Sequence, residues 1–190
     1  VIYPSEQYFS DVDHSYWAFA WISRLYRAGI TTGCSINPMN YCPGNNVSRA
    51  EMAIFLERGM RGSTYVPPNA SGNLFADVSL STWAAAWIEQ LYSDGITTGC
   101  DDNPLSYCPG NPVSRAEMAI FLLRAKHGSD YEPDPVGDST GFDDVSIDHW
   151  AAKWIKQLAA EGITTGCGGM NYCPNQPVPR DQMATFLVRT

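Results

Sequence analysis

The sequence predicts an all-α protein of three tandem helical-hairpin repeats packed around a shared centre. The hexapeptide Gly-Ile-Thr-Thr-Gly-Cys occurs three times, at 29–34, 95–100 and 162–167. Each copy lies between two segments whose apolar residues recur at helical spacing. A period of about 66 residues exceeds that of common solenoids, so we expect each repeat to be a small subdomain of about two helices. Six cysteines fall in three equally placed pairs, which predicts one disulfide-pinned loop per repeat.

The chain divides into three repeats and two linkers, and nothing is left over for a separate catalytic domain. We place the repeats at 1–62, 75–127 and 142–190, and the linkers at 63–74 and 128–141. Both linkers contain proline and glycine residues, which interrupt regular secondary structure. A unit of this size alone buries little apolar surface, so we expect the three repeats to share one core.

The first helix of each repeat follows a tryptophan and is expected at 17–28, 83–94 and 150–161. In the first copy the apolar residues form one stripe: Trp17, Trp21, Ile22 and Leu25. A glycine stands where a left-handed C-cap is expected, at Gly29, Gly95 and Gly162. A short polar residue can cap the front end, at Ser15, Ser81 and Asp148.

The N-terminus of the second helix of each repeat is more clearly marked in the sequence than that of the first. Ser48 with Glu51, and Ser114 with Glu117, have capping-box spacing, in which hydroxyl and carboxylate each satisfy a free backbone N–H. The third repeat has Pro179 there, and proline has no side-chain oxygen, so we expect a weaker helix start. The residues expected to be buried recur in register: Met52, Phe55, Leu56, Met118, Phe121, Leu122, Met183, Phe186 and Leu187.

Repeat symmetry favours one disulfide inside each repeat, although six cysteines allow many other pairings. The favoured pairs are Cys34–Cys42, Cys100–Cys108 and Cys167–Cys173. Zinc is the rival interpretation, but the histidines do not repeat in register with the cysteines, and two thiolates per repeat fall short of a structural zinc site. Disulfides predict an oxidising, extracytoplasmic setting, and we expect no metal and no cofactor.

Composition argues against several classes of function. The formal net charge of −8 argues against nucleic acid as a partner, because nucleic-acid recognition needs a basic face. The acidic excess lies in the second and third repeats, so an anion would need a local basic site. No apolar run approaches the roughly 20 residues of a membrane span. No signal peptide is evident, so we expect mature or excised material. No nucleophile–base pair recurs, so we expect no enzyme.

The repeat closely resembles the S-layer homology repeat. The resemblance rests on Phe-x-Asp-Val, on a helix led by tryptophan, on Gly-Ile-Thr-Thr-Gly and on Ser-Arg-Ala-Glu before an apolar helix. It covers nearly all of the chain and occurs three times in order. It implies a pseudo-threefold, three-pronged helical domain. Such a domain would bind anionic, often pyruvylated, secondary cell-wall polysaccharide and fasten proteins to the bacterial cell surface.

The resemblance implies a ligand site made from three residues of each repeat. These are Arg49, Arg115, Arg180, Gly33, Gly99, Gly166, Trp17, Trp83 and Trp150. The arginines independently suit an anion, because each lies in the first turn of a helix, where free N–H groups favour negative charge and a guanidinium can hold a carboxylate. The alternatives are a solvated arginine, or an arginine that pairs with an acid of a neighbouring repeat such as Asp77. We expect Arg49→Ala with Arg115→Ala to abolish wall binding and to leave the fold intact.

Other recurring residues have simpler interpretations. The second tryptophan of each first helix is expected in the core: Trp21, Trp87 and Trp154. Core packing is also the favoured interpretation for the leading tryptophans Trp17, Trp83 and Trp150. The repeated aspartates are expected to form turns or caps: Asp11, Asp77 and Asp144.

Two departures from the family pattern bear on the site. A Cys-to-Cys loop replaces the family's usual Asp-Gly loop, and the third repeat lacks Ser-Arg-Ala-Glu. We therefore expect ligand binding to be weakest beside the third repeat. The alternative function is self-assembly into a surface layer, sheath or filament, because the chain is made of repeats throughout and repeat-like faces can stack head to tail. Copies of the chain itself are then the partner.

Overall fold

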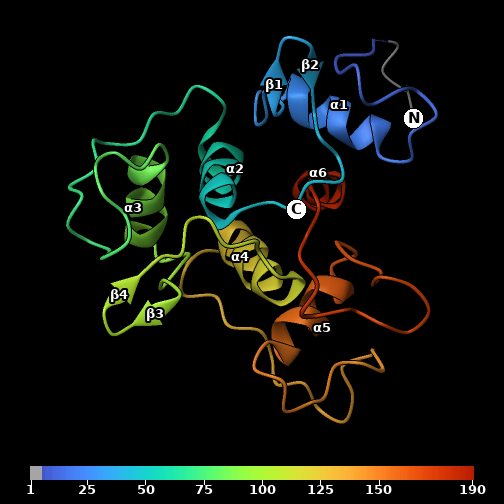
Figure 1. Ribbon diagram of the computed structural model, residues 1–190. Coiled ribbons are helices and arrows are strands. Elements are labelled where there is room, and N and C mark those ends of the chain that lie inside the picture. Colours follow the sequence, from blue (N-terminus) through green and yellow to red (C-terminus); the bar gives the residue numbers. More distant parts are fainter. Residues whose placement is uncertain (1–5) are drawn as a thin grey trace.

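The computed structural model describes residues 6–190. Within that range the chain forms six α-helices, two in each repeat (Figure 1). Their bounds are α1 Phe19–Arg27, α2 Arg49–Arg61, α3 Ala85–Ser93, α4 Arg115–His127, α5 Ala152–Ala160 and α6 Arg180–Arg189. None of these helices has both the length and the apolar character that a membrane crossing requires.

Two small antiparallel hairpins, which the all-α expectation did not include, lie in the first two disulfide loops. They pair β1 Ser35–Ile36 with β2 Met39–Asn40, and β3 Asp101–Asp102 with β4 Leu105–Ser106. The third loop is shorter, with a Cys-to-Cys separation of 6 residues where the other two have 8, and makes an isolated bridge between Gly168 and Asn171. Each disulfide holds the two ends of its loop together, so the backbone groups between them can pair.

The helices form an inner and an outer set around the molecular centre. The inner set is α2, α4 and α6, and the outer set is α1, α3 and α5 (Figure 1). Each outer helix packs on an inner helix of another repeat: α3 on α2, α5 on α4 and α1 on α6. The main helix pairs thus join different repeats, whereas the sequence suggested a hairpin within each. Each linker leads the chain back, so that the next outer helix packs on the inner helix that precedes it in sequence. The packing of α1 on α6 joins the first repeat to the third, and the three repeats form a closed ring.

Three backbone hydrogen bonds link the repeats in a cycle just before the inner helices. The amide of Val47 donates to the carbonyl of Val178, that of Val113 to Val47, and that of Val178 to Val113, each at 2.9 Å. All three valines are fully buried. The cycle needs each repeat to supply one donor and one acceptor, so the backbone relates the three repeats in the same way at every junction.

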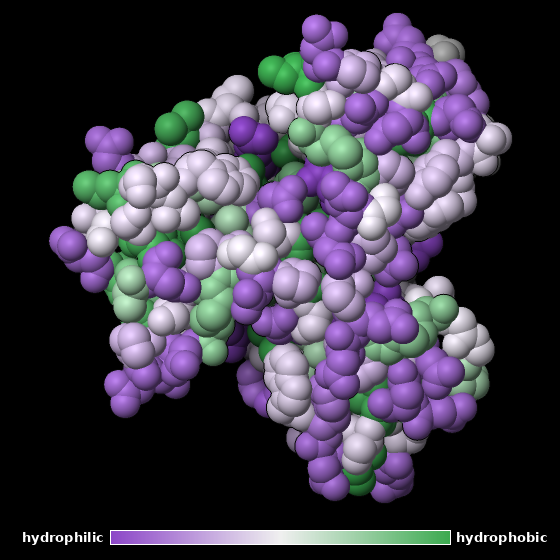
Figure 2. Space-filling view, viewed as in Figure 1, coloured by the Kyte–Doolittle hydropathy of each residue, from purple (hydrophilic) through white to green (hydrophobic). Residues whose placement is uncertain are grey.

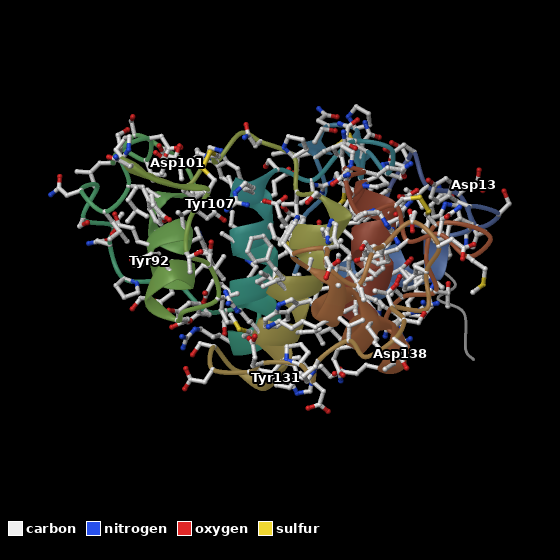
Figure 3. The ribbon with its side chains drawn as sticks, turned by 90° about the horizontal axis from the view of Figure 1, so that it is seen from below. Asp13, Tyr92, Asp101, Tyr107, Tyr131 and Asp138 are labelled. Carbon is white, nitrogen blue, oxygen red and sulfur yellow. A yellow bond between two sulfur atoms is a disulfide. The ribbon has the colours of Figure 1, made fainter. Side chains whose placement is uncertain are left out.

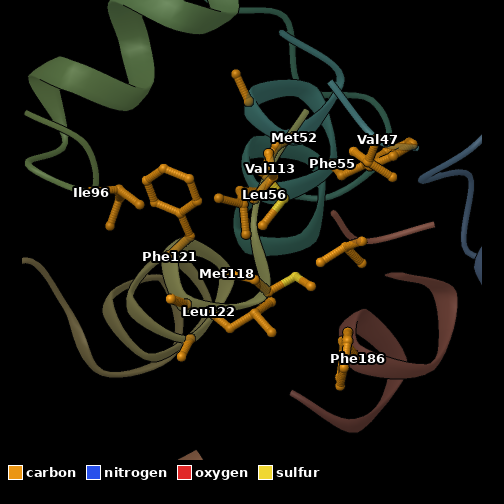
Figure 4. Close-up of a cluster of buried hydrophobic side chains, with 14 of the residues drawn as sticks. Val47, Met52, Phe55, Leu56, Ile96, Val113, Met118, Phe121, Leu122 and Phe186 are labelled. Atoms are coloured by element: carbon orange, nitrogen blue, oxygen red, sulfur yellow. The ribbon is translucent and has the colours of Figure 1, made fainter. Parts of the chain in front are cut away.

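The largest apolar cluster lies between the inner helices. Met52 and Leu56 of α2 meet Met118 and Leu122 of α4, and Phe186 of α6 packs on the same cluster (Figure 4). A second, smaller cluster surrounds α1 and includes Ala184 of α6. One core therefore spans all three repeats.

The helix starts divide into two kinds. The predicted capping boxes are confirmed: the amide of Ser48 donates to Glu51 at 2.9 Å and the amide of Glu51 donates to the Ser48 hydroxyl at 3.2 Å, with the same pattern at α4. Pro179 makes no side-chain cap, as expected. The predicted caps Ser15, Ser81 and Asp148 are wrong, because turns precede the outer helices and move their N-caps to alanines without side-chain hydrogen bonds.

Candidate functional site

Three grooves separate the lobes of the molecule, and each is built from all three repeats. Hollows between the lobes are visible on the face in Figure 2. Groove A is defined by Gly33, Trp83 and Arg180, groove B by Gly99, Trp150 and Arg49, and groove C by Gly166, Trp17 and Arg115. Their volumes are about 190, 310 and 460 Å³ respectively. The nine residues singled out in the sequence thus meet in threes, one arginine, one glycine and one tryptophan at a time.

The leading tryptophans form exposed walls of these grooves. Trp17 is 56% exposed, Trp83 67% and Trp150 60%, so the interpretation that they pack in the core is wrong. Each lies in the turn before an outer helix, outside the apolar stripe that the sequence assigned to it. An indole exposed beside a groove offers a flat apolar face to a ligand.

The second tryptophans lie beneath arginines. Trp154 is buried as expected, whereas Trp21 and Trp87 are half-buried against the core. The guanidinium of Arg189 lies 5.1 Å from the Trp21 ring centre, and those of Arg58 and Arg124 lie 5.3 Å from Trp87 and Trp154. These distances are within the range of a cation–π interaction. The stacked arginines also line the grooves, one in each.

Each motif arginine (Arg49, Arg115 or Arg180) donates hydrogen bonds to the next repeat, and we call this contact the clasp. Arg49 is only 3% exposed. Its Nε donates to the carbonyl of Tyr107 at 2.8 Å, its Nη1 to Oε1 of Glu117 at 2.5 Å and its Nη2 to the carbonyl of Gly99 at 3.0 Å. The expected pairing with an acid of a neighbouring repeat is therefore observed, but the acid is not Asp77 and is instead the capping-box Glu117. Its Oε2 caps its own helix while its Oε1 receives the neighbour's arginine.

Buried tyrosines complete each clasp, and sequence reasoning missed them. The Tyr107 hydroxyl donates to the carbonyl of Arg49 at 2.8 Å, and Tyr107 lies beside α2 in Figure 3. Tyr172 with Arg115, and Tyr41 with Arg180, repeat the arrangement. Desolvation on burial raises the pKa of all three tyrosines well above the usual value. Their recurrence in the three Tyr-Cys-Pro triplets was the signal that could have revealed them.

The repeated aspartates shape the backbone, as expected. Asp11 accepts hydrogen bonds from the amides of Tyr41 and Cys42 at 2.8 and 2.7 Å. Asp77 and Asp144 bind the corresponding amides of their own repeats. Each aspartate therefore fixes the segment that carries both the buried tyrosine and the second cysteine.

The groove glycines allow a close approach of the backbone. Gly33 has a φ of +89°, and a Cβ atom there would lie 2.4 Å from the carbonyl oxygen of Asn40. The same obstruction, from Ser106 or Asn171, faces Gly99 and Gly166. Any side chain would push the disulfide loop away, so these glycines position the loop of the groove.

The disulfides form as predicted. Cys34–Cys42, Cys100–Cys108 and Cys167–Cys173 are bonded, each with a Cα–Cα distance of 6.0 Å. Asp77 lies near Cys100 and Cys108, and Asp144 near Cys167 and Cys173. These cysteines have no thiolate to offer a metal, because both sulfurs of each pair are in a disulfide.

Each groove concentrates positive charge on a chain whose net charge is −8. The side chains that set this charge are Arg58, Arg180 and Glu51 in groove A, Arg49, Arg124 and Glu117 in groove B, and Arg115, Arg189 and Gln182 in groove C. Two guanidinium groups thus face one carboxylate in grooves A and B and a neutral amide in groove C. Burial lowers the pKa of Arg115 below the usual value of arginine. The local basic site that an anion requires is present in all three grooves.

A model of the S-layer homology domain family matches residues 8–53 and 141–184. The chain is 29% identical over 182 residues to an amylopullulanase of Thermoanaerobacterium thermosulfurigenes, 25% over 155 residues to a cellulosome-anchoring protein of Acetivibrio thermocellus, and 29% over 115 residues to a cell surface protein of Thermoanaerobacter kivui. These alignments cover 94%, 78% and 60% of this chain but only 9%, 32% and 15% of the relatives. The matched segments lie in the first and third repeats, and the second repeat carries the same motifs, so the chain contains S-layer homology segments and is similar to cell-surface proteins that have them.

Proposed function

We propose that this chain is a non-catalytic module that anchors protein to the cell envelope by binding anionic wall polysaccharide in grooves A, B and C. The observation that carries the proposal is the recurrence of one groove design three times. Each groove combines an exposed tryptophan, a pair of arginines and the Thr-Thr-Gly loop. A pseudo-threefold, three-pronged arrangement would give a repeating polymer three similar places to bind.

The groove chemistry suits an acidic sugar. An exposed indole can stack on the apolar face of a pyranose ring. The arginines favour a carboxylate, and the burial of Arg49, Arg115 and Arg180 limits screening of these three by salt. In each loop the first threonine is buried and accepts a hydrogen bond from the groove glycine, as Thr31 does from Gly33 at 3.2 Å. The second threonine, such as Thr32, is exposed and can contact a sugar hydroxyl.

The relatives support an anchoring role. Two of them are called a cellulosome-anchoring protein and a cell surface protein. The chain spans 9% of the amylopullulanase, which fits a module attached to a much larger enzyme. We propose that catalysis in such relatives belongs to the parts that this chain does not cover.

Removing the groove tryptophans tests the proposal. The triple variant Trp17→Ala, Trp83→Ala and Trp150→Ala should bind isolated cell walls at least about tenfold more weakly in a sedimentation assay, because aromatic anchors dominate binding energy. The three side chains are exposed, so the variant should keep the circular dichroism and melting temperature of the wild type.

The matched control changes three exposed apolar side chains that lie outside the groove linings, Ile36, Val66 and Leu80, to alanine. This control should bind as the wild type does. Full wall binding by the tryptophan variant, or an equal loss of binding in the control, would show that the grooves are not the wall-binding sites.

A further inference from the structure

The three grooves differ at one position that faces the clasp arginine. Arg49 donates to Glu117 and Arg180 donates to Glu51, both at 2.5 Å, so grooves B and A each contain an internal ion pair. In groove C the corresponding residue is Gln182, whose Oε1 accepts from Nη1 of Arg115 at 2.8 Å. An amide fills the same space as a carboxylate but leaves the charge of the guanidinium uncompensated.

Arg115 also has an unused hydrogen-bond donor. Its side chain is 2% exposed, and its Nη2 atom is buried without a hydrogen-bond partner. The equivalent atom of Arg49 donates to the carbonyl of Gly99 at 3.0 Å. A buried donor without a partner costs free energy, and an incoming acceptor would recover that cost.

The surroundings of Arg115 favour an anion over any other ligand. Among the described residues that line groove C, the charged ones are Arg115 and Arg189. The nearby carboxylate of Asp144 is occupied by the amides of Tyr172 and Cys173. Groove C has the largest volume of the three, about 460 Å³, and Trp17 forms an exposed wall beside it.

We infer that groove C is the principal carboxylate-binding site of the chain, with Arg115 as its anchor and Arg189 as its second cation. In grooves A and B an incoming carboxylate meets the resident glutamate, which competes for the arginine and repels the ligand's charge. This reverses the expectation that binding is weakest beside the third repeat, because the loss of the capping-box acid frees the site for a ligand. The inference deepens the proposed function and rests on it for the physiological ligand.

Acetate, a carboxylate without a sugar, tests groove C directly. The Nε–H of Arg115 donates to the Tyr172 carbonyl at 2.6 Å and is buried, so its nuclear magnetic resonance signal should be protected from exchange. Titration of the full chain with sodium acetate, against sodium chloride at equal ionic strength, should move the signals of Arg115 and the Trp17 indole in a saturable way. The signals of Arg49 and Arg180 should move little.

Two exchanges of amide and carboxylate provide matched variants. Gln182→Glu gives groove C the ion pair of the other grooves and should weaken acetate binding there by about tenfold or more. Glu117→Gln does the reverse in groove B, and glutamine still suits a capping box, so a new acetate response should appear at Arg49. If the native chain shows no response beyond that of chloride, or if Gln182→Glu leaves the response unchanged, the assignment of groove C is wrong.

The wall assay separates this inference from the proposed function. Acetate binding at Arg115 in a chain that does not bind cell walls would overturn the anchoring proposal and keep the carboxylate site. Wall binding that depends on Trp83 and Trp150 but is unaffected by Gln182→Glu would keep the anchoring proposal and overturn the primacy of groove C.

Discussion

The clasp arginines show why a conspicuous residue in a motif can have a structural duty. Arg49 was expected to face a ligand or to pair with a neighbouring acid, and its three hydrogen bonds reach residues of the next repeat. Its guanidinium also lies 5.0 Å from the ring centre of Tyr107. The same group that lines groove B therefore also holds two repeats together.

Replacing Arg49 by alanine should destabilise the fold. Loss of the guanidinium leaves the carbonyls of Tyr107 and Gly99 without their donor and removes the ion pair of Glu117, whose side chain is 31% exposed, which should cost about 1–3 kcal/mol. Urea unfolding followed by circular dichroism measures the change. Arg27→Ala, at the exposed end of α1, is the control and should change the free energy of unfolding by less than about 0.5 kcal/mol. An Arg49→Ala chain as stable as the control would restore the original expectation that this residue can be removed without loss of fold.

Glu57 is a buried acid at a position where the other repeats have Leu123 and Val188. Desolvation and the nearby charge of Asp94 raise the pKa of Glu57 to about 7, even though Arg61 pairs with it. The folded chain therefore favours the protonated acid. Stability is highest below the unfolded pKa and falls as the pH rises through the folded value near 7.

Glu57→Leu should remove this pH dependence. Between about pH 4.5 and 7.5 the wild type should lose roughly 2–3 kcal/mol of stability relative to the variant, since a shift of one pKa unit corresponds to about 1.4 kcal/mol. Urea denaturation at several pH values provides the difference. A constant difference across this range would mean that Glu57 keeps an ordinary pKa in the folded chain.

At the scale of the helix, the capping boxes stabilise the inner helices and also position the clasp acid. Ser114→Ala should lower the free energy of unfolding by about 1–2 kcal/mol, because it removes the hydroxyl that accepts from the Glu117 amide. Ser93→Ala, at the exposed end of α3, should have little effect. Equal effects of the two substitutions in a chemical denaturation series would show that the cap contributes nothing.

Contacts between residues close in sequence made much of the helix and loop structure predictable. Glycine after α1, the two capping boxes and the disulfide pairs follow from neighbours in the sequence, and the structure has them all. The exposure of Trp17 was not predictable from helical spacing, because the helix begins two residues later, at Phe19. The packing of α1 on α6 was also not predictable, since sequence repeats identify equivalent helices but do not show which repeat supplies the helix that packs on each of them.

At the scale of the molecule, the ring closes through a contact between its first and third repeats. The hydroxyl of Tyr16 donates to Asp181 at 2.6 Å. Burial and this hydrogen bond to a carboxylate raise the pKa of Tyr16 to about 12. Asp181 replaces the alanine found at the equivalent places in α2 and α4, so this junction has a polar contact that the other two lack at that position. Self-assembly of the closed ring into a polymer stays a prediction.

The central claim is that the three grooves bind wall polysaccharide. The most direct measurement is a titration of the ¹⁵N-labelled chain with purified wall polysaccharide from the bacterium that produces it, followed at the six tryptophan indoles. The account expects saturable shifts at Trp17, Trp83 and Trp150, with the largest at Trp17, and little change at the buried Trp154, which serves as an internal control. Absence of any saturable shift, or shifts confined to residues outside the grooves, would contradict it.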